Sequence, residues 1–399
     1  MDTERKIFIE LRKAVSTKLG KEISSSSHCD ELSIELKKIG FIINAQTFRR
    51  FFGLIKSSGN FHIFTLDALS QYCEFPDFSS FKKNLIENEL DIFFGDLDGK
   101  HPEFNYWALS ENICRKIIDS PSMLASVHHQ LVKYPLARTF FIEHHPLRDL
   151  AGTVYAQYFH DYLKYEHANE AKLFAYGFLY MSAFLTENGE FMEIYAQKIR
   201  ETELTSEVYV LPAARKFGVA LLQSWLKKDE RYFKETYNQM LVARETYKES
   251  SEKSVCSFEY AVLEHLIFTD KTEEMRFLIE NNTFQIHRDR EFVPQDRKEN
   301  HEVCWNIMCA VAYLKMEEYA ECEIYLNKVH LGELSLGWKK YYSILFYFVK
   351  YEFANFEEKL VIENKLSGLI EDTHMVYFSK QLKSLVNKNL ENKNFAAIS

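Results

Sequence analysis

Residues 44–53 place aromatic and basic side chains on different faces of one predicted helix. The aromatic face consists of rings spaced three and four residues apart, namely Phe48, Phe51 and Phe52. The polar side chains fall largely off that face and are Gln46, Arg49 and Arg50. A helix of this kind can pack on a small bundle through its rings while its other side faces DNA.

The ends of this helix are marked by residues that favour helix caps. Asn44 can accept a hydrogen bond from an unpaired backbone amide of the first turn, and Gly53 is typical of a helix end. The preceding helix is predicted from Asp30, as its cap, to Gly40. Its apolar stripe is Leu32, Leu36 and Ile39. Residues 40–43 then form a short turn between the two helices.

Three further short helices are predicted around this pair. The first carries an apolar stripe and ends at Gly20; the stripe is Ile7, Leu11, Ala14, Val15 and Leu19. The serine run 24–27 is expected to belong to the link that follows it. Thr65 is the expected N-cap of a fourth helix, which turns Leu66, Leu69 and Tyr72 inward. Phe78 and Phe81 continue the pattern into a last helix.

Five short helices with a tight turn between the second and third resemble the lambda-repressor-like helix-turn-helix domain. The resemblance covers about the first 85 residues and is carried mainly by residues 32–40, 44–52 and 65–72. It implies contacts with bases and phosphates from Gln46, Thr47, Arg49 and Arg50. The alternative is a small helical bundle that only docks on the rest of the chain.

Charge limits where nucleic acid can bind. The chain has 49 Lys and Arg, 58 Asp and Glu, and a net charge of −9. Residues 1–90 hold 13 of the basic and 12 of the acidic residues, so the excess of acid lies beyond them, where it repels phosphate. DNA affinity therefore depends on a few local cations, which are Arg49, Arg50, Lys56, Lys37 and Lys38. So few positive charges favour binding as a dimer.

Composition predicts helices in the remainder. The 13 Gly and 7 Pro among 399 residues are few, which disfavours sheets and long turns, whereas 33 Phe and 23 Tyr can fill the space between stacked helices. The 7 Cys without a CxxC pair indicate reduced thiols in a cytosolic protein. The N-terminus has no signal-peptide core. The charge-free stretch 173–186 is too short to cross a membrane, so it predicts a buried helix.

Beyond residues 89–104, where two glycines and a proline predict a linker, turn signals recur at intervals of 41, 41, 46 and 37 residues. The markers are Phe191, Tyr232, Glu273, Tyr319 and Phe356. In the clearest hairpin, residues 303–330, Ala310 and Tyr313 are expected to pack against Cys322 and Leu326. These spacings resemble a degenerate tetratricopeptide repeat, a fold whose concave surface binds peptides or protein segments.

Histidines are the main alternative source of chemistry. They occur as His128-His129 and His144-His145, followed by His160 and His167 with nearby carboxylates. Adjacent histidines point to different helix faces, and there is no HExxH, Walker loop, GxGxxG or GxSxG. We therefore expect no metal site, no cofactor and no enzymatic activity; a hydrolase or metalloenzyme is the third interpretation.

Together these patterns predict an all-α protein with a helix-turn-helix-like bundle over residues 1–88, a linker over 89–104 and an α-solenoid of helical hairpins over 105–395. The layout is similar to that of peptide-responsive bacterial regulators, in which the repeat domain binds a peptide and controls dimerisation. It implies a cytoplasmic, DNA-binding transcriptional regulator with a sensory or dimerising repeat domain. Such a regulator could form a homodimer, and no membrane partner is expected. The alternative is a non-enzymatic protein-interaction scaffold whose bundle does not bind DNA.

Overall fold

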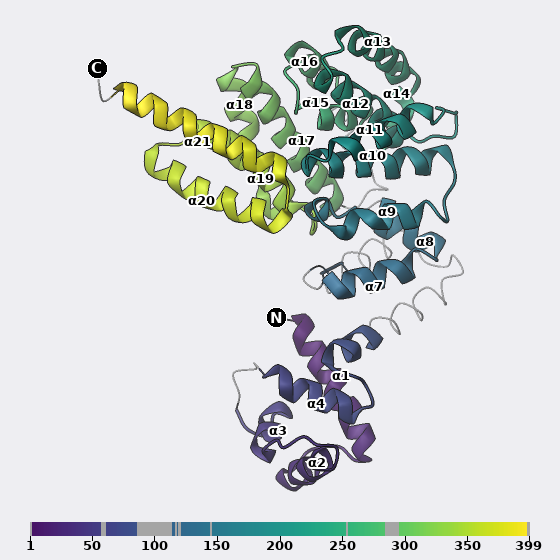
Figure 1. Cartoon of the computed structure of the whole chain (residues 1–399), viewed down its shortest axis with the longest axis vertical. Coiled ribbons are helices and arrows are strands. Elements are labelled where there is room, and N and C mark those ends of the chain that lie inside the picture. Colours follow the sequence, from purple (N-terminus) through teal and green to yellow (C-terminus); the bar gives the residue numbers. More distant parts are fainter. Residues whose placement is uncertain are drawn as a thin grey trace. The chain divides into compact units, whose positions relative to one another are not determined.

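The computed structural model describes residues 2–56, 61–85, 114–115, 118, 121–143, 146–252, 254–283 and 295–396. Every regular element in these ranges is helical and none is a strand, which confirms the all-α class. The chain divides into two compact units, residues 1–101 with 116–130 and residues 102–115 with 131–399 (Figure 1). The predicted linker, residues 89–104, lies outside the described ranges.

The first unit is built from helices, of which α1 and α2, and α2 and α3, are joined by short turns. Gly20 and Gly53 follow two of the helices with φ of 75° and 76°, the left-handed region that glycine enters without strain. The helices are α1 (Asp2–Leu19), α2 (Ser26–Lys38), α3 (Ala45–Phe51), α4 (Ile63–Tyr72), a segment at 78–85, and α7 (Pro121–Leu131), whose last residue belongs to the second unit. The predicted ends of the first and third helices are confirmed.

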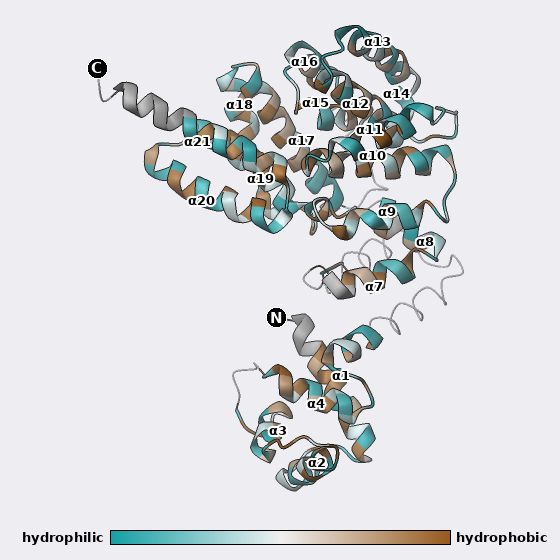
Figure 2. Ribbon diagram, viewed as in Figure 1, coloured by the Kyte–Doolittle hydropathy of each residue, from teal (hydrophilic) through white to brown (hydrophobic). Residues whose placement is uncertain are grey.

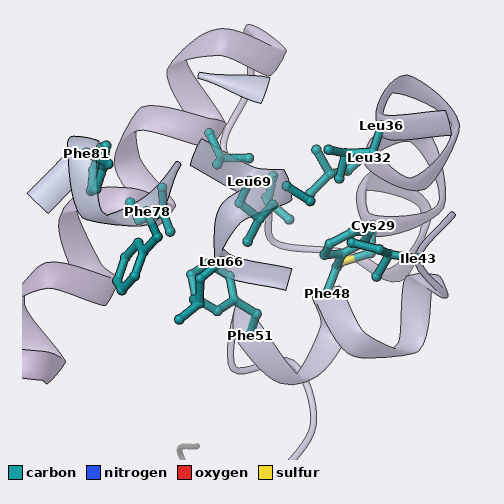
Figure 3. Packing of buried hydrophobic residues seen from close by; sticks show 14 residues of the cluster. Cys29, Leu32, Leu36, Ile43, Phe48, Phe51, Leu66, Leu69, Phe78 and Phe81 are labelled. Carbon is teal, nitrogen blue, oxygen red and sulfur yellow. The ribbon is translucent and has the colours of Figure 1, made fainter. Parts of the chain in front are cut away.

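The core of the first unit gathers the apolar faces of all these short helices except α7 (Figure 3). Phe48 and Phe51 of α3 are fully buried, and the Phe51 ring meets the ring of Phe8 in α1 at 6.0 Å between centroids. Leu66 and Leu69 turn inward from α4, as predicted. Burying one such side chain contributes on the order of 1.5–3 kcal/mol, so these residues fix how α3 sits on the bundle.

Two predicted helix starts are wrong. The second helix begins at Ser26 inside the serine run, and Ser25 rather than Asp30 caps it by accepting a hydrogen bond from the His28 amide. The extra turn is favoured because it buries Cys29 one turn ahead of the predicted stripe. The fourth helix is capped by His62, whose Nδ1 accepts from the Phe64 amide, and Thr65 lies buried inside it.

The second unit consists of longer helices. All nine residues of α15 are buried, whereas only four of the seventeen in α13 are, and Figure 2 shows the corresponding difference in hydropathy. The elements are α8 (Pro135–Ala137), η1 (Arg138–Glu143), η2 (Arg148–Leu150), η3 (Val154–Ala156), α9 (Gln157–Tyr162), α10 (Asn169–Leu185), α11 (Gly189–Glu201), α12 (Val210–Leu226), α13 (Glu230–Thr246), α14 (Lys248–Glu252), α15 (Phe258–Leu266), α16 (Thr272–Glu280), α17 (Gln295–Lys315), α18 (Tyr319–Leu326), η5 (Leu331–Glu333), α19 (Lys339–Phe353), α20 (Phe356–Thr373) and α21 (Val376–Ala396).

Short turns join consecutive helices at each point where a turn signal recurs. The turns lie between α10 and α11, α12 and α13, α15 and α16, α17 and α18, and α19 and α20, and each of these pairs is in contact. In the α17–α18 pair the Cys322 thiol donates to the Ala310 carbonyl at 3.2 Å, and the Tyr313 ring stacks on Tyr325 at 5.5 Å. The charge-free stretch is the buried helix α10, as predicted.

The beginning and the end of the second unit are in contact. The Tyr341 amide of α19 donates to the Asp149 carboxylate of η2 at 2.8 Å, and the Asp149 amide donates to the Gly337 carbonyl at 2.7 Å. The rings of Phe184 in α10 and Tyr377 in α21 lie 4.7 Å apart. These contacts hold η2 against the first turn of α19 and bring Arg148 into the interior of the unit.

Candidate nucleic-acid interface

The cap and the core fix the orientation of α3. The side-chain oxygen Oδ1 of Asn44 accepts from the Gln46 backbone amide at 2.8 Å, which confirms the predicted cap. With Phe48 and Phe51 buried on one side, Gln46 and Arg50 are exposed. They are four residues apart and therefore share a face. The helix thus presents an amide and a guanidinium next to each other on its open side.

Arg49 differs from the prediction that it would lie on the exposed side. Its side chain is 28% exposed, and its guanidinium donates to the Asp30 carboxylate of α2 at 2.7 Å. Burial raises the pKa of the neighbouring Cys29 thiol, and Arg49 partly offsets this effect. Arg49 therefore connects α3 to α2. Sequence reasoning missed this because it assigned Asp30 to a helix cap, and no local pattern pairs residues 19 positions apart.

The other sequence-predicted residues lie around this face. Thr47 is half-buried, and Lys56 is exposed three residues after Gly53. Lys37 is also exposed, whereas Lys38 forms an ion pair with Glu35 at 2.6 Å. With Arg49 and Lys38 occupied by carboxylates, the exposed cations around α3 without an ion pair in the described ranges are Arg50, Lys37 and Lys56. Any attraction of this surface for phosphate depends on them.

An apolar surface on the first unit was not anticipated from the sequence. Ile42, in the turn between α2 and α3, is 83% exposed, and Ile63 and Phe64 at the start of α4 are 56% and 49% exposed. The Phe64 ring lies 5.6 Å from the ring of Phe41, so the turn and α4 are neighbours. We call Ile42, Phe41, Ile63 and Phe64 the isoleucine-phenylalanine surface.

Two of the histidine and carboxylate side chains that the sequence singled out make pairwise contacts in the second unit. The imidazole of His160 meets the Tyr195 hydroxyl at 3.0 Å, and Arg138 donates to Glu166 at 2.6 Å. Burial lowers the pKa of His160, which Asp161 partly opposes. In the described ranges, which leave out His144 and His145, no three His, Cys, Asp or Glu side chains gather as metal ligands would.

Comparisons of the chain with protein-family models, with curated proteins and with solved structures gave no match. Among the helices described, none combines the length and the apolar character that a membrane-spanning segment needs.

Proposed function

We propose that this chain is a cytoplasmic transcriptional regulator that binds DNA through α3. The observation that supports the proposal is the two-faced helix, in which Phe48 and Phe51 are fully buried while Gln46 and Arg50 are exposed on a shared face. Glutamine and arginine are the side chains that read adenine and guanine by paired hydrogen bonds. This part of the chain would thus be a lambda-repressor-like helix-turn-helix domain.

The remaining predicted residues take supporting roles in this proposal. Lys56 would contact phosphate, and Thr47 would contact the backbone or a base edge from the same helix as Gln46. Arg49 would act by holding α3 against α2 through Asp30 rather than by contacting DNA. Because so few cations are available, one copy would bind weakly, and we propose that a homodimer binds DNA.

For the second unit we propose a tetratricopeptide-like solenoid with a sensory or dimerising role. Support comes from the helix pairs joined at regularly recurring turns. Stacked pairs of this kind offer an extended surface to a peptide or protein segment. The proposal includes neither an enzymatic activity nor a cofactor.

The second candidate function is a protein-interaction scaffold whose first unit does not touch DNA. It is favoured by the isoleucine-phenylalanine surface, because exposed apolar side chains that lie together mark interaction sites. In that case the unit would use Ile42 and Phe64 to bind a protein, and Arg50 would be a solvated charge.

A gel-shift titration of the full chain with genomic fragments and with random duplex separates the two functions. The regulator should bind duplex at low salt and should prefer a subset of the genomic fragments. If neither kind of duplex is retarded at low salt, the regulator hypothesis fails and the scaffold is the better interpretation. An Ile42→Ser variant should bind DNA normally if the isoleucine-phenylalanine surface serves a different contact.

A further inference from the structure

The second unit encloses an ion pair inside its helices. The Arg148 guanidinium of η2 lies 2.5 Å from the Glu264 carboxylate of α15, with the two side chains 12% and 2% exposed. The Tyr342 hydroxyl donates to the same carboxylate at 3.3 Å, and the Arg148 guanidinium lies 4.5 Å from the centre of the Trp338 ring. Burial raises the pKa of Glu264, but Arg148 and Arg215 more than offset this, so the net pKa is lowered and Glu264 is a carboxylate.

Aromatic rings from three helices surround this pair. Tyr260 lies 5.6 Å from His301, His301 lies 5.2 Å from Trp338, and Trp338 lies 6.1 Å from Tyr342. The hydroxyls of Tyr342 and Tyr260 are 3.3 Å apart, which completes a closed series of contacts. Trp305 stacks on Tyr260 at 6.2 Å. Trp338 and Tyr342 therefore contact the ion pair directly, and the other rings extend the cluster around them.

A second cation adds a positive charge that no carboxylate balances. Arg215 of α12 is partly buried, and in the described part of the chain it makes no hydrogen bond and no ion pair; its guanidinium lies 5.6 Å from the Phe174 ring. Arg215 lies one turn before Gly218, where α12 packs against the ring of His265, the residue that follows Glu264. Burial lowers the pKa of Arg215, Glu264 opposes this, and Arg148 adds to it, in keeping with that position. A second guanidinium therefore lies in the neighbourhood of the Arg148–Glu264 pair.

Arg215 is held in place by close packing. A Cβ atom at Gly177 of α10 would lie 2.2 Å from the Cδ of Arg215, so the glycine makes room for the arginine stem. A side chain placed this tightly is not a solvated surface charge.

Several hydrogen-bond donors in the same neighbourhood meet no acceptor. They are Arg148 Nε, Trp305 Nε1, Trp338 Nε1 and the Tyr341 hydroxyl, all on side chains that are buried or nearly so. Arginine and tryptophan nitrogens can only donate. Buried donors are rarely left without a partner, so each group of this kind needs an explanation. His265 Nε2 is an unpartnered acceptor next to Glu264, since this ring donates through Nδ1, but the other unpartnered atoms named here are donors. A negatively charged ligand rich in acceptors would match these donors and the second guanidinium.

We propose that Arg148 and Arg215, with the ring donors around them, bind the carboxylate of an organic anion. The planar guanidinium fork fits a carboxylate with two parallel hydrogen bonds, and the ion pair with Glu264 holds Arg148 in position. The carboxylate belongs to a free organic acid or to the C-terminus of a peptide. The inference deepens the sensory role proposed for the second unit and rests on it, but binding of the anion can be measured without DNA.

The test uses tryptophan fluorescence of the full chain, because two of its four tryptophans belong to this cluster. Three probes are titrated at constant ionic strength against chloride: succinate, a Leu-Ala-Leu-Ala peptide with a free C-terminus, and the same peptide amidated. We expect saturable binding of succinate or of the free peptide, and whichever binds identifies the source of the carboxylate. Binding of the amidated peptide as tightly as the free one, or no saturable response to any probe, would overturn the proposal.

Variants separate a binding site from a structural ion pair. Arg215→Met should keep the fold, since the guanidinium has no hydrogen bond to lose, and should weaken carboxylate binding by about tenfold or more, the usual effect of one charged hydrogen bond. Arg231→Met is the matched control, because Arg231 is 89% exposed, and it should bind as wild type does.

Unchanged binding in Arg215→Met would refute the assignment of this arginine. If Arg215→Met does not fold, Arg215→Lys is used instead. It keeps the positive charge but loses the planar guanidinium, so it should still weaken carboxylate binding. If the protein binds DNA but no carboxylate, the anion site is refuted and the regulator hypothesis is not. If it binds a carboxylate but no DNA, the regulator hypothesis is refuted and the anion site is not. The two failures are therefore distinguishable.

Discussion

Arg49 of α3 donates a hydrogen bond to Asp30 of α2 at 2.7 Å, which joins the two helices on either side of the tight turn. Its neighbour Arg50 is exposed and makes no ion pair in the described ranges. Two adjacent arginines that are equivalent in sequence thus differ in structure, and they should differ when they are replaced.

Replacing Arg49 or Asp30 by Ala should loosen α3, whereas Arg50→Ala should not. The coupling between Arg49 and Asp30 in a double-mutant cycle should be about 0.2–1 kcal/mol, because both side chains are partly exposed and water screens the pair. Arg50→Ala should change stability by less than about 0.5 kcal/mol. Hydrogen exchange of the α3 amides measures each change. Equal protection in Arg49→Ala and Arg50→Ala would show that the ion pair does not hold the helix.

Two glycine substitutions should change stability in opposite directions. At Gly218 of α12 an added Cβ would lie 2.5 Å from Nδ1 of His265, a fully buried ring in α15, so Gly218→Ala should destabilise the unit by about 1–3 kcal/mol. At Gly368 of α20 nothing lies within 4 Å, so Gly368→Ala should stabilise by about 0.5–1 kcal/mol. All four tryptophans belong to the second unit, so urea denaturation followed by their fluorescence reports both effects. A stabilised Gly218→Ala variant would mean that α12 and α15 can move apart at little cost.

His265 should make the second unit less stable in mild acid. Burial lowers its pKa from 6.5 to about 4, while its Nδ1 donates to the Ala261 carbonyl at 3.0 Å. The folded state therefore keeps the ring neutral, whereas the unfolded state takes up a proton below pH 6.5. The contribution is fully present above pH 6.5 and is lost as the pH falls toward 4, with a slope that approaches about 1.4 kcal/mol per pH unit.

The variant His265→Asn isolates this contribution, because an amide can still donate to Ala261 but does not titrate. Its urea midpoint should fall less steeply between pH 6.5 and 5 than that of the wild type. His167→Gln removes an exposed histidine of the same unit and should leave the wild-type slope unchanged. Parallel slopes for wild type and His265→Asn would show that this ring is not responsible for acid sensitivity.

Most of the helices could be predicted from the sequence because their ends and buried faces are set by residues close together in the chain. Asn44 caps α3 and the phenylalanines choose its buried face, and both effects act within one turn of helix. The recurring turn signals likewise mark where the helices of the second unit end. The wrong start of the second helix shows the limit of such signals, since Ser25 and Asp30 are equally good caps and only burial of Cys29 favours the earlier start.

Contacts between residues that are far apart in the sequence could not be predicted from sequence patterns. The pairing of Arg49 with Asp30, and of Arg148 with Glu264, depends on how helices pack and not on spacing along the chain. The composition shows an acidic second unit, yet Arg148 and Glu264 are paired inside it and the pKa of Glu264 is lowered by two arginines. The burial of each side chain decides which of these charges interact strongly, and burial cannot be read from a single sequence.

The last prediction concerns Arg50 as a DNA contact. Arg50→Ala should weaken DNA binding without unfolding the first unit, because the side chain is exposed and unpaired in the described ranges. Loss of one phosphate contact lowers the slope of log affinity against log salt by about 1, whereas loss of a base contact costs roughly 1–3 kcal/mol of specificity. Gel-shift titrations at two salt concentrations distinguish these results. Arg49→Ala is the informative comparison, because we expect it to act on DNA binding indirectly, by loosening α3. Any loss of DNA affinity in this variant should therefore be accompanied by faster hydrogen exchange of the α3 amides. Arg231→Ala, an exposed arginine of the second unit, should leave both the affinity and the slope unchanged. If Arg50→Ala binds duplex as the wild type does at both salt concentrations, the open face of α3 is not the DNA-binding surface.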